Sequence, residues 1–149
     1  MEIKSHSPLE TKEKGKNLAK KILKDKNDKK AKVLALEGDL GGGKTTFLQG
    51  FAKGLGIKDK ILSPTFVLMK KFEIPKNKKF KNFYHFDCYR IKGPKEISEL
   101  GFNEIVSDPQ NIIAIEWAER IRGILPTNKT LLKFNFLNKK NRKIWIKNV

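Results

Sequence analysis

The stretch that decides the fold is EGDLGGGKTTFLQG, residues 37–50. It fits the pattern G-x-x-x-x-G-K-[ST] without a mismatch, through Gly38, Gly43, Lys44 and Thr45. An apolar run of strand length, KVLALE, precedes it at residues 32–37, and residues 45–56 follow with apolar side chains at helical spacing. The motif therefore lies between a strand and a helix, which is the context that a phosphate-binding loop requires.

Each residue type in this loop has a physical task. Gly41, Gly42 and Gly43 let the backbone turn tightly, so that its N–H groups can approach phosphate oxygens. The start of the following helix adds partial positive charge. Lys44 supplies a full cation for the β- and γ-phosphates, and the Thr45 hydroxyl is placed to ligate Mg²⁺. The alternative is a glycine-rich turn that matches by chance, and the flanking strand and helix argue against it.

Composition bounds the class of protein. The chain has 149 residues, of which 38% are hydrophobic, so we expect one globular domain over residues 1–149. No apolar run reaches membrane-spanning length and the start of the chain carries no apolar signal segment, which predicts a cytoplasmic protein with no membrane partner. Cys88 is the single cysteine, so an intrachain disulfide is excluded, and a zinc site is not expected.

The formal net charge of +17 has two interpretations. One is a polyanionic partner such as RNA, because clustered cations attract phosphates. The other is compositional bias, since most of the 33 basic residues are lysines spread along the chain and Asn, Ile and Phe are also frequent. Either one predicts a weak, salt-sensitive attraction to RNA.

The rest of the chain predicts an α/β fold with a mixed sheet flanked by helices. We expect an opening helix over residues 7–25, capped by Ser7 or Thr11, and one or two short helices within residues 93–109. We expect strands at 32–37, 63–74 and 80–91, a buried strand within 111–121 that breaks at its acidic end, and a terminal hairpin over 130–149. The short link between the second and third of these strands predicts an antiparallel hairpin.

Phosphate hydrolysis also needs a carboxylate near the metal and a group that orients water. Glu116 ends the buried run IIAIE, and Asp87 ends FYHFD, so both acids lie where a strand would deliver them. Thr65, in the segment SPT, is a candidate for contacting Mg²⁺ or the γ-phosphate. The alternative for each acid is a helix cap or a solvated turn. Trp117 is either core or a nucleotide contact, and Tyr89 with Arg90 forms either a catalytic edge or a stacked surface pair.

Three classes of nucleotide-binding protein remain. The chain lacks the Asn-Lys-x-Asp segment expected of a GTPase, which favours adenine over guanine. A small-molecule kinase usually surrounds the transferred phosphoryl group with several arginines. This chain has four arginines in total, which disfavours a kinase. A nucleotide-gated module that hydrolyses slowly and acts on RNA or protein partners is the third class.

Four motifs together resemble one family. The segments GDLGGGKTTF, SPTFVL, YHFDCYR and IEWAERI, the last followed by LP, occur in the order and at the spacing of the bacterial TsaE (YjeE) proteins, over nearly the whole chain. The resemblance implies a P-loop ATPase of tRNA N6-threonylcarbamoyladenosine synthesis that acts with TsaB-like and TsaD-like partners. That assembly modifies adenosine 37, so contact with tRNA is expected indirectly through the complex or by weak electrostatic attraction.

The resemblance also assigns site residues, with ATP and Mg²⁺ as cofactors. It implies phosphate or nucleotide contacts from Thr11, Gly41, Gly42, Gly43, Lys44, Thr45, Thr46 and Arg142. It implies that Thr45 and Glu116 serve Mg²⁺ and that Asp87 lies at the hydrolysis site, with Lys44 and Thr65 as further catalytic candidates.

The chain departs from the family pattern in three places. The loop reads GGGK where GAGK is usual, which adds backbone freedom. Val67, Lys70 and Lys71 stand where a hydroxyl and acidic residues are common, so this surface differs from that of the family. Cys88 replaces a usual leucine and is expected to serve packing.

Overall fold

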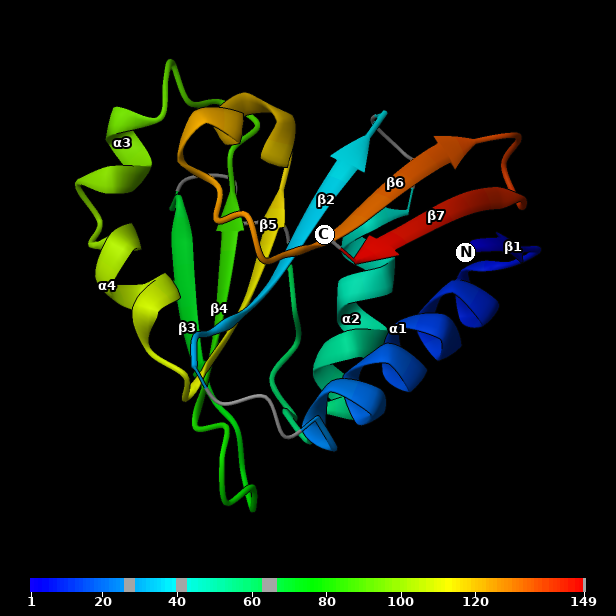
Figure 1. Cartoon of the computed structure of the whole chain (residues 1–149). Coiled ribbons are helices and arrows are strands. Elements are labelled where there is room, and N and C mark those ends of the chain that lie inside the picture. Colours follow the sequence, from blue (N-terminus) through cyan, green and yellow to red (C-terminus); the bar gives the residue numbers. More distant parts are fainter. Residues whose placement is uncertain (26–28, 40–42, 63–66, 149) are drawn as a thin grey trace.

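The structure is a computed structural model that describes residues 1–25, 29–39, 43–62 and 67–148 (Figure 1). The strands are β1 (Glu2–Ser5), β2 (Lys32–Gly38), β3 (Met69–Glu73), β4 (Asn82–Asp87), β5 (Asn111–Glu116), β6 (Thr130–Phe136) and β7 (Arg142–Asn148). The helices are α1 (Pro8–Leu23), α2 (Lys44–Gly54), α3 (Lys95–Ser98), α4 (Phe102–Ser107) and the 3₁₀ helix η1 (Ala118–Ile124).

Within the described residues the strands form one mixed sheet in the order β1-β7-β6-β2-β5-β4-β3. The four central strands, β6, β2, β5 and β4, are paired in parallel, whereas β3 pairs with β4 and β7 pairs with β6 in antiparallel fashion. Helices lie on both faces of the sheet (Figure 1). The predicted α/β class, the mixed sheet and both antiparallel hairpins are therefore confirmed.

The parallel strands position the functional site. β2 and β5 read as apolar runs because each is buried on both faces of the sheet. Their carboxyl ends meet at one edge, where Asp87 of β4 is the register partner of Glu116 of β5 and β2 runs into the phosphate loop. Open α/β sheets bind ligands at this edge.

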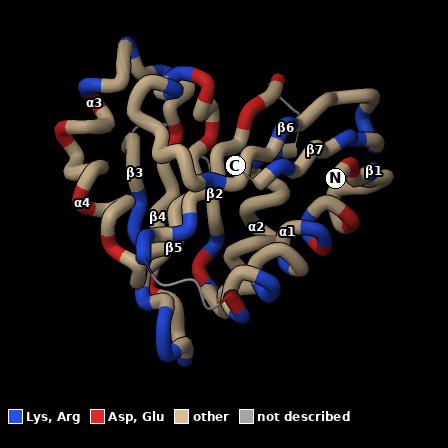
Figure 2. Tube along the Cα trace, in the orientation of Figure 1, with Lys and Arg blue, Asp and Glu red and all other residues tan. Residues whose placement is uncertain are grey.

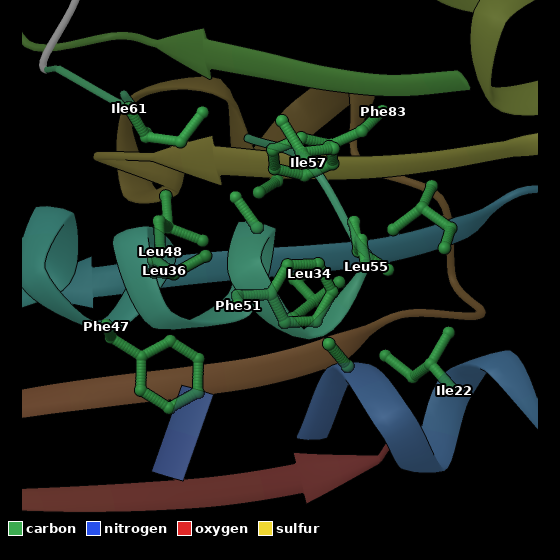
Figure 3. Packing of buried hydrophobic residues seen from close by; sticks show 14 of the residues in the cluster. Ile22, Leu34, Leu36, Phe47, Leu48, Phe51, Leu55, Ile57, Ile61 and Phe83 are labelled. Atoms are coloured by element: carbon green, nitrogen blue, oxygen red, sulfur yellow. The ribbon is translucent and has the colours of Figure 1, made fainter. Parts of the chain in front are cut away.

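A hydrophobic core lies on each face of the sheet. In one, Phe47 and Phe51 of α2 pack with Leu34 and Leu36 of β2 (Figure 3). The other lies under α3, α4 and η1 and contains Cys88. Burial raises the pKa of the Cys88 thiol to about 12, so the thiol stays protonated and serves packing, as predicted.

Helices α1 and α2 approach closely at glycines. Gly15 of α1 faces the Phe47 carbonyl, and Gly50 of α2 faces the Lys12 carbonyl, where a Cβ atom would overlap the backbone. Ser7 caps α1 by accepting a hydrogen bond from the Glu10 N–H at 3.0 Å, which confirms one of the two predicted caps. This packing places the start of α1 beside the start of α2.

Three boundaries differ from the sequence-based expectation. β1 was not predicted, and it pairs antiparallel with β7 at the far end of the chain. β4 ends at Asp87 rather than continuing to residue 91, because the Asp87 carboxylate accepts a hydrogen bond from the Tyr89 N–H at 3.0 Å and fixes a turn. The expected strand over 63–74 is β3 alone among the described residues, since residues 63–66 lie outside them.

Charge is distributed unevenly along this frame. Figure 2 shows lysine and arginine segments on α1 and on the hairpins at both sides of the sheet, whereas acidic segments gather on α3 and α4 and near the loop after β2. The net positive charge therefore does not cover every element equally.

Candidate functional site

Two glycines with positive φ angles lie at the end of β2 and at the start of α2. Gly38 has a φ of 133° and Gly43 a φ of 95°, values that favour glycine. Gly43 is the N-cap of α2 and provides no side-chain hydrogen bond, so the first N–H groups of this helix carry no side-chain cap. Gly41 and Gly42 lie outside the described residues. An uncapped helix start with this sequence suits an anion.

Lys44 is folded back onto its own loop. Its Nζ donates hydrogen bonds to the carbonyl oxygens of Gly38 at 2.6 Å and Asp39 at 2.9 Å. The ammonium also lies 4.2 Å from the centroid of the Trp117 ring. Burial lowers the pKa of Lys44, and the nearby carboxylates, Glu116 first, oppose that shift. A phosphate oxygen would give this buried cation a charged partner in place of two carbonyls.

The tip of β5 is tied to the start of α2. Thr45 Oγ1 donates a hydrogen bond to Glu116 Oε1 at 2.8 Å. The second carboxylate oxygen, Glu116 Oε2, lies 2.6 Å from His85 Nε2. Glu116 is 3% exposed and His85 is fully buried, so this carboxylate is held at both oxygens. The two predicted Mg²⁺ residues, Thr45 and Glu116, are therefore in direct contact.

Asp87 lies beside Glu116 at the same sheet edge. It is 7% exposed, and its Oδ1 accepts the Tyr89 N–H. Strand alternation directs His85 and Asp87 to the same side of β4. The structure thus brings Lys44, Thr45, Glu116 and Asp87 together, while Thr65 falls outside the described residues.

An aromatic and cationic group borders Lys44. Trp117 has a left-handed backbone, with a φ of 58°. Tyr89 packs against its ring with the centroids 5.0 Å apart, and the Arg120 guanidinium lies 5.7 Å from the Trp117 ring. Tyr89 and Arg90 were expected to form either a catalytic edge or a stacked surface pair. Tyr89 does pack against other side chains, but its partners are Trp117 and Arg120, and Arg90 is exposed. Trp117 therefore lines the site that holds Lys44.

The start of α1 and the β6–β7 hairpin approach the loop from the other side. A small cavity here is lined by Pro8, Thr11, Gly43, Thr46, Lys139, Lys140 and Arg142. The Thr11 hydroxyl bonds within its own segment, 2.6 Å from Ser5 Oγ and 3.1 Å from the Ser7 carbonyl oxygen. The Arg142 guanidinium donates to the carbonyl oxygens of Asn138 and Asn141. Both predicted residues border Gly43, but their polar groups are directed to the protein.

Comparisons with known proteins agree with this geometry. Residues 5–144 match the family model described as "Threonylcarbamoyl adenosine biosynthesis protein TsaE". This chain belongs to the TsaE family. Among curated TsaE proteins, the one from Rickettsia prowazekii is 44% identical over 118 residues, covering 78% of this chain and 76% of the relative. The one from Haemophilus influenzae is 36% identical over 122 residues, covering 82% and 73%.

A solved structure supports the same assignment. The crystal structure of Bacillus subtilis YdiB superposes with a TM-score of 0.72 at 30% identity, covering all of this chain and 85% of that one. The curated relatives are named tRNA threonylcarbamoyladenosine biosynthesis proteins. The resemblance inferred from four sequence motifs is therefore confirmed, and the TsaE family name places its members in that pathway.

The donor set of the TsaE site suits a hard cation that is shared with a ligand. Thr45 and Glu116 offer oxygen atoms, and the described ranges contain no group of three or more His, Cys, Asp or Glu residues able to cage a metal alone. Mg²⁺ typically takes one or two carboxylates, substrate phosphates and waters. The residues thus fit Mg²⁺ accompanied by a nucleotide. Among the helices described, none has the length and apolar character to traverse a bilayer.

Sequence reasoning missed several residues of this site. His85 was not singled out from the sequence, although its place two residues before Asp87 on one strand face was a usable signal. Arg122 pairs with Glu37 at 3.1 Å, and this ion pair raises the pKa of Arg122. Burial raises the pKa of Glu119, whose Oε1 has no hydrogen-bond partner within the described part. No regular spacing in the sequence connects Arg122 with Glu37 or marks Glu119 as a buried acid.

Proposed function

We propose that this chain binds ATP with Mg²⁺ and hydrolyses it as an accessory subunit in tRNA N6-threonylcarbamoyladenosine modification, together with TsaB-like and TsaD-like partners. Membership in the TsaE family supports the pathway. The observation that carries the chemistry is the Thr45–Glu116 hydrogen bond at the start of α2, because it joins the phosphate-loop hydroxyl to a strand-end carboxylate.

The phosphate chain would lie over the loop and the start of α2. Main-chain N–H groups there, from Gly41 to Thr46 by motif, would donate to phosphate oxygens, and Lys44 would exchange its two carbonyl contacts for the β- and γ-phosphates. Thr45 and Glu116 would hold Mg²⁺ or its waters. When bound, the ion neutralises charge on the phosphates. Thr11, Thr46 and Arg142 would border the rest of the nucleotide.

Asp87 would act on the attacking water. Its carboxylate lies at the tip of β4 beside Glu116, where it can accept a hydrogen bond from water and align it with the phosphoryl group. Thr65 is proposed as a further contact to Mg²⁺ or the γ-phosphate on the basis of the SPT motif alone.

The contacts that the arginines make support the proposal that the chain alone hydrolyses ATP slowly. A guanidinium that stabilises the transferring phosphoryl group contributes roughly 10³- to 10⁵-fold to turnover in related enzymes. Here Arg122 is paired with Glu37, Arg142 with turn carbonyls, and Arg120 with the Trp117 and Tyr89 rings. The fourth arginine, Arg90, is exposed and lies beyond the end of β4. This also argues against a small-molecule kinase, which would need arginines on its phosphate. We therefore propose that partners complete the site.

The first test is a pull-down from the native lysate with and without ATP. A TsaB/TsaD-like pair should be recovered, and its yield should depend on ATP, because the nucleotide would occupy the site that the partners are proposed to complete. The control bait is the Lys44→Ala variant, whose yield should not respond to ATP. If neither partner is recovered with or without ATP, the proposed assembly is wrong.

A further inference from the structure

The sheet extends beyond β2 by three strands, and only one face of this extension is covered. The inner face of β6 and β7 belongs to the core with α1 and α2, through Leu132, Phe134 and Ile144. In Figure 1 the helices α3, α4 and η1 lie over the β3–β4–β5 half of the other face, and none of the described helices lies in front of β6 and β7. The outer face of β1–β7–β6 is therefore open.

One aromatic side chain stands among lysines on this open face. Trp145 of β7 is the register partner of Lys133 of β6 and of Glu2 of β1. Strand alternation puts Lys143 and Lys147 on the same face as Trp145, and Lys4 is opposite Lys143. Five of these residues, Lys4, Lys133, Lys143, Trp145 and Lys147, are called the lysine–tryptophan face below.

Trp145 is a large apolar side chain, yet it is exposed to solvent. Its exposed fraction is 44%, and the Lys143 ammonium lies 5.7 Å from its ring centroid. Lys143 also pairs with Glu2 at 3.2 Å, so one of the four lysines is neutralised on the face itself. Lys4, Lys133 and Lys147 are exposed and surround the ring with positive charge.

The charge of this region is local. Residues 129–148 contain the basic residues Lys129, Lys133, Lys139, Lys140, Arg142, Lys143 and Lys147, and no acidic residue. Residues 95–108, on the other side of the molecule, contain Lys95 with Glu96, Glu99, Glu104 and Asp108. Figure 2 shows the same contrast between the β6–β7 hairpin and the α3–α4 region. A general excess of lysine in the composition would not by itself place the basic and the acidic residues in different parts of the molecule.

We propose that the lysine–tryptophan face binds single-stranded RNA, with a base stacked on Trp145 and phosphates on Lys133, Lys147 and Lys4. A flat aromatic ring in a basic surface is the arrangement that stacks unpaired bases. A protein partner is disfavoured because lysine is depleted in protein interfaces, and Trp145 is the one large apolar side chain among the five residues that define this face. The proposed ATPase function requires no such contact, so the two proposals fail independently.

The test measures RNA binding by the whole chain. The probe is a fluorescein-labelled single-stranded RNA of about 12 nucleotides, with a duplex of the same composition as comparison, followed by anisotropy. Trp145→Ala, which changes no charge, should weaken single-strand binding at least about fivefold, while Trp145→Phe should retain most of it. The duplex, whose bases are already stacked, should bind equally to all three proteins.

Charge-matched variants separate a specific face from general attraction. Lys133→Gln with Lys147→Gln should reduce the magnitude of the slope of log affinity against log salt by about 1.4. The control is Lys92→Gln with Lys95→Gln, which removes the same charge from exposed positions at α3 and should leave the slope close to that of the parent.

Two results would overturn the proposal. Equal slopes for the two double variants would mean that the attraction to RNA is only compositional. Unchanged single-strand binding by Trp145→Ala would mean that no base stacks on Trp145, and if that variant also loses a TsaB/TsaD-like pair in the pull-down, the lysine–tryptophan face serves protein. Circular dichroism of each variant verifies that an altered affinity does not reflect unfolding.

Discussion

Replacing Lys44 with alanine is expected to abolish the thermal stabilisation of this chain by Mg–ATP. A ligand at about 100 times its Kd stabilises a protein by about 2.7 kcal/mol. For a chain of this size that corresponds to a shift in Tm of about 5 to 10 °C. The Lys44→Ala variant loses the ammonium group that lies at the loop carbonyls. Its Tm should therefore stay within about 1 °C when Mg–ATP is added.

The matched control for this variant is Lys53→Ala. Lys53 is an exposed lysine in the last turn of the same helix, so its removal changes the net charge equally without touching the loop. Differential scanning fluorimetry with and without Mg–ATP compares the two. Full stabilisation of Lys44→Ala would remove the phosphate-loop interpretation.

Substitutions of the two strand-end acids are expected to affect different properties: the Mg²⁺ requirement for Glu116 and turnover for Asp87. Glu116→Gln keeps the size of the side chain beside Thr45 and His85 but loses its charge. It should therefore raise the Mg²⁺ requirement by at least about tenfold. Asp87→Asn should leave ATP binding close to that of the parent and lower turnover by about 10²-fold or more, because an amide oxygen is a weaker hydrogen-bond acceptor for water than a carboxylate and does not take up its proton. Calorimetry gives ATP and Mg²⁺ affinity, and phosphate release in the presence of partners gives turnover.

Glu99→Gln is the control for lost negative charge, because Glu99 is exposed at the end of α3. It should match the parent in affinity and turnover. Glu116→Ala should be more damaging than Glu116→Gln, since alanine also leaves the buried His85 without its carboxylate. Parent-level turnover by both Asp87→Asn and Glu116→Gln would show that these acids are not the hydrolysis site.

Local patterns predicted the centre of the fold and the positions of the site acids. A strand, a glycine-rich loop and a helix are adjacent in sequence, and an acid at the end of a buried apolar run must emerge at the sheet edge. For the same reason Asp87 and Glu116 were found without any knowledge of strand order, and the structure places them in register.

Long-range pairing was beyond the reach of those patterns. β1 is four residues long and carries charged residues, so its pairing with β7 depends on the sheet edge that β7 provides. The same holds for the Arg122–Glu37 pair, whose residues are 85 positions apart in the chain. Each contact joins segments whose meeting depends on the whole topology, and no periodicity encodes it.

The most direct test of the account is steady-state phosphate release from Mg–ATP by the pure chain, with and without a TsaB/TsaD-like pair. We expect binding of ATP but slow release by the chain alone, since Arg120, Arg122 and Arg142 are engaged by other groups, and a large increase when the pair is added. Fast release by the lone chain, unchanged by the pair, would contradict the account and indicate a self-sufficient enzyme such as a kinase.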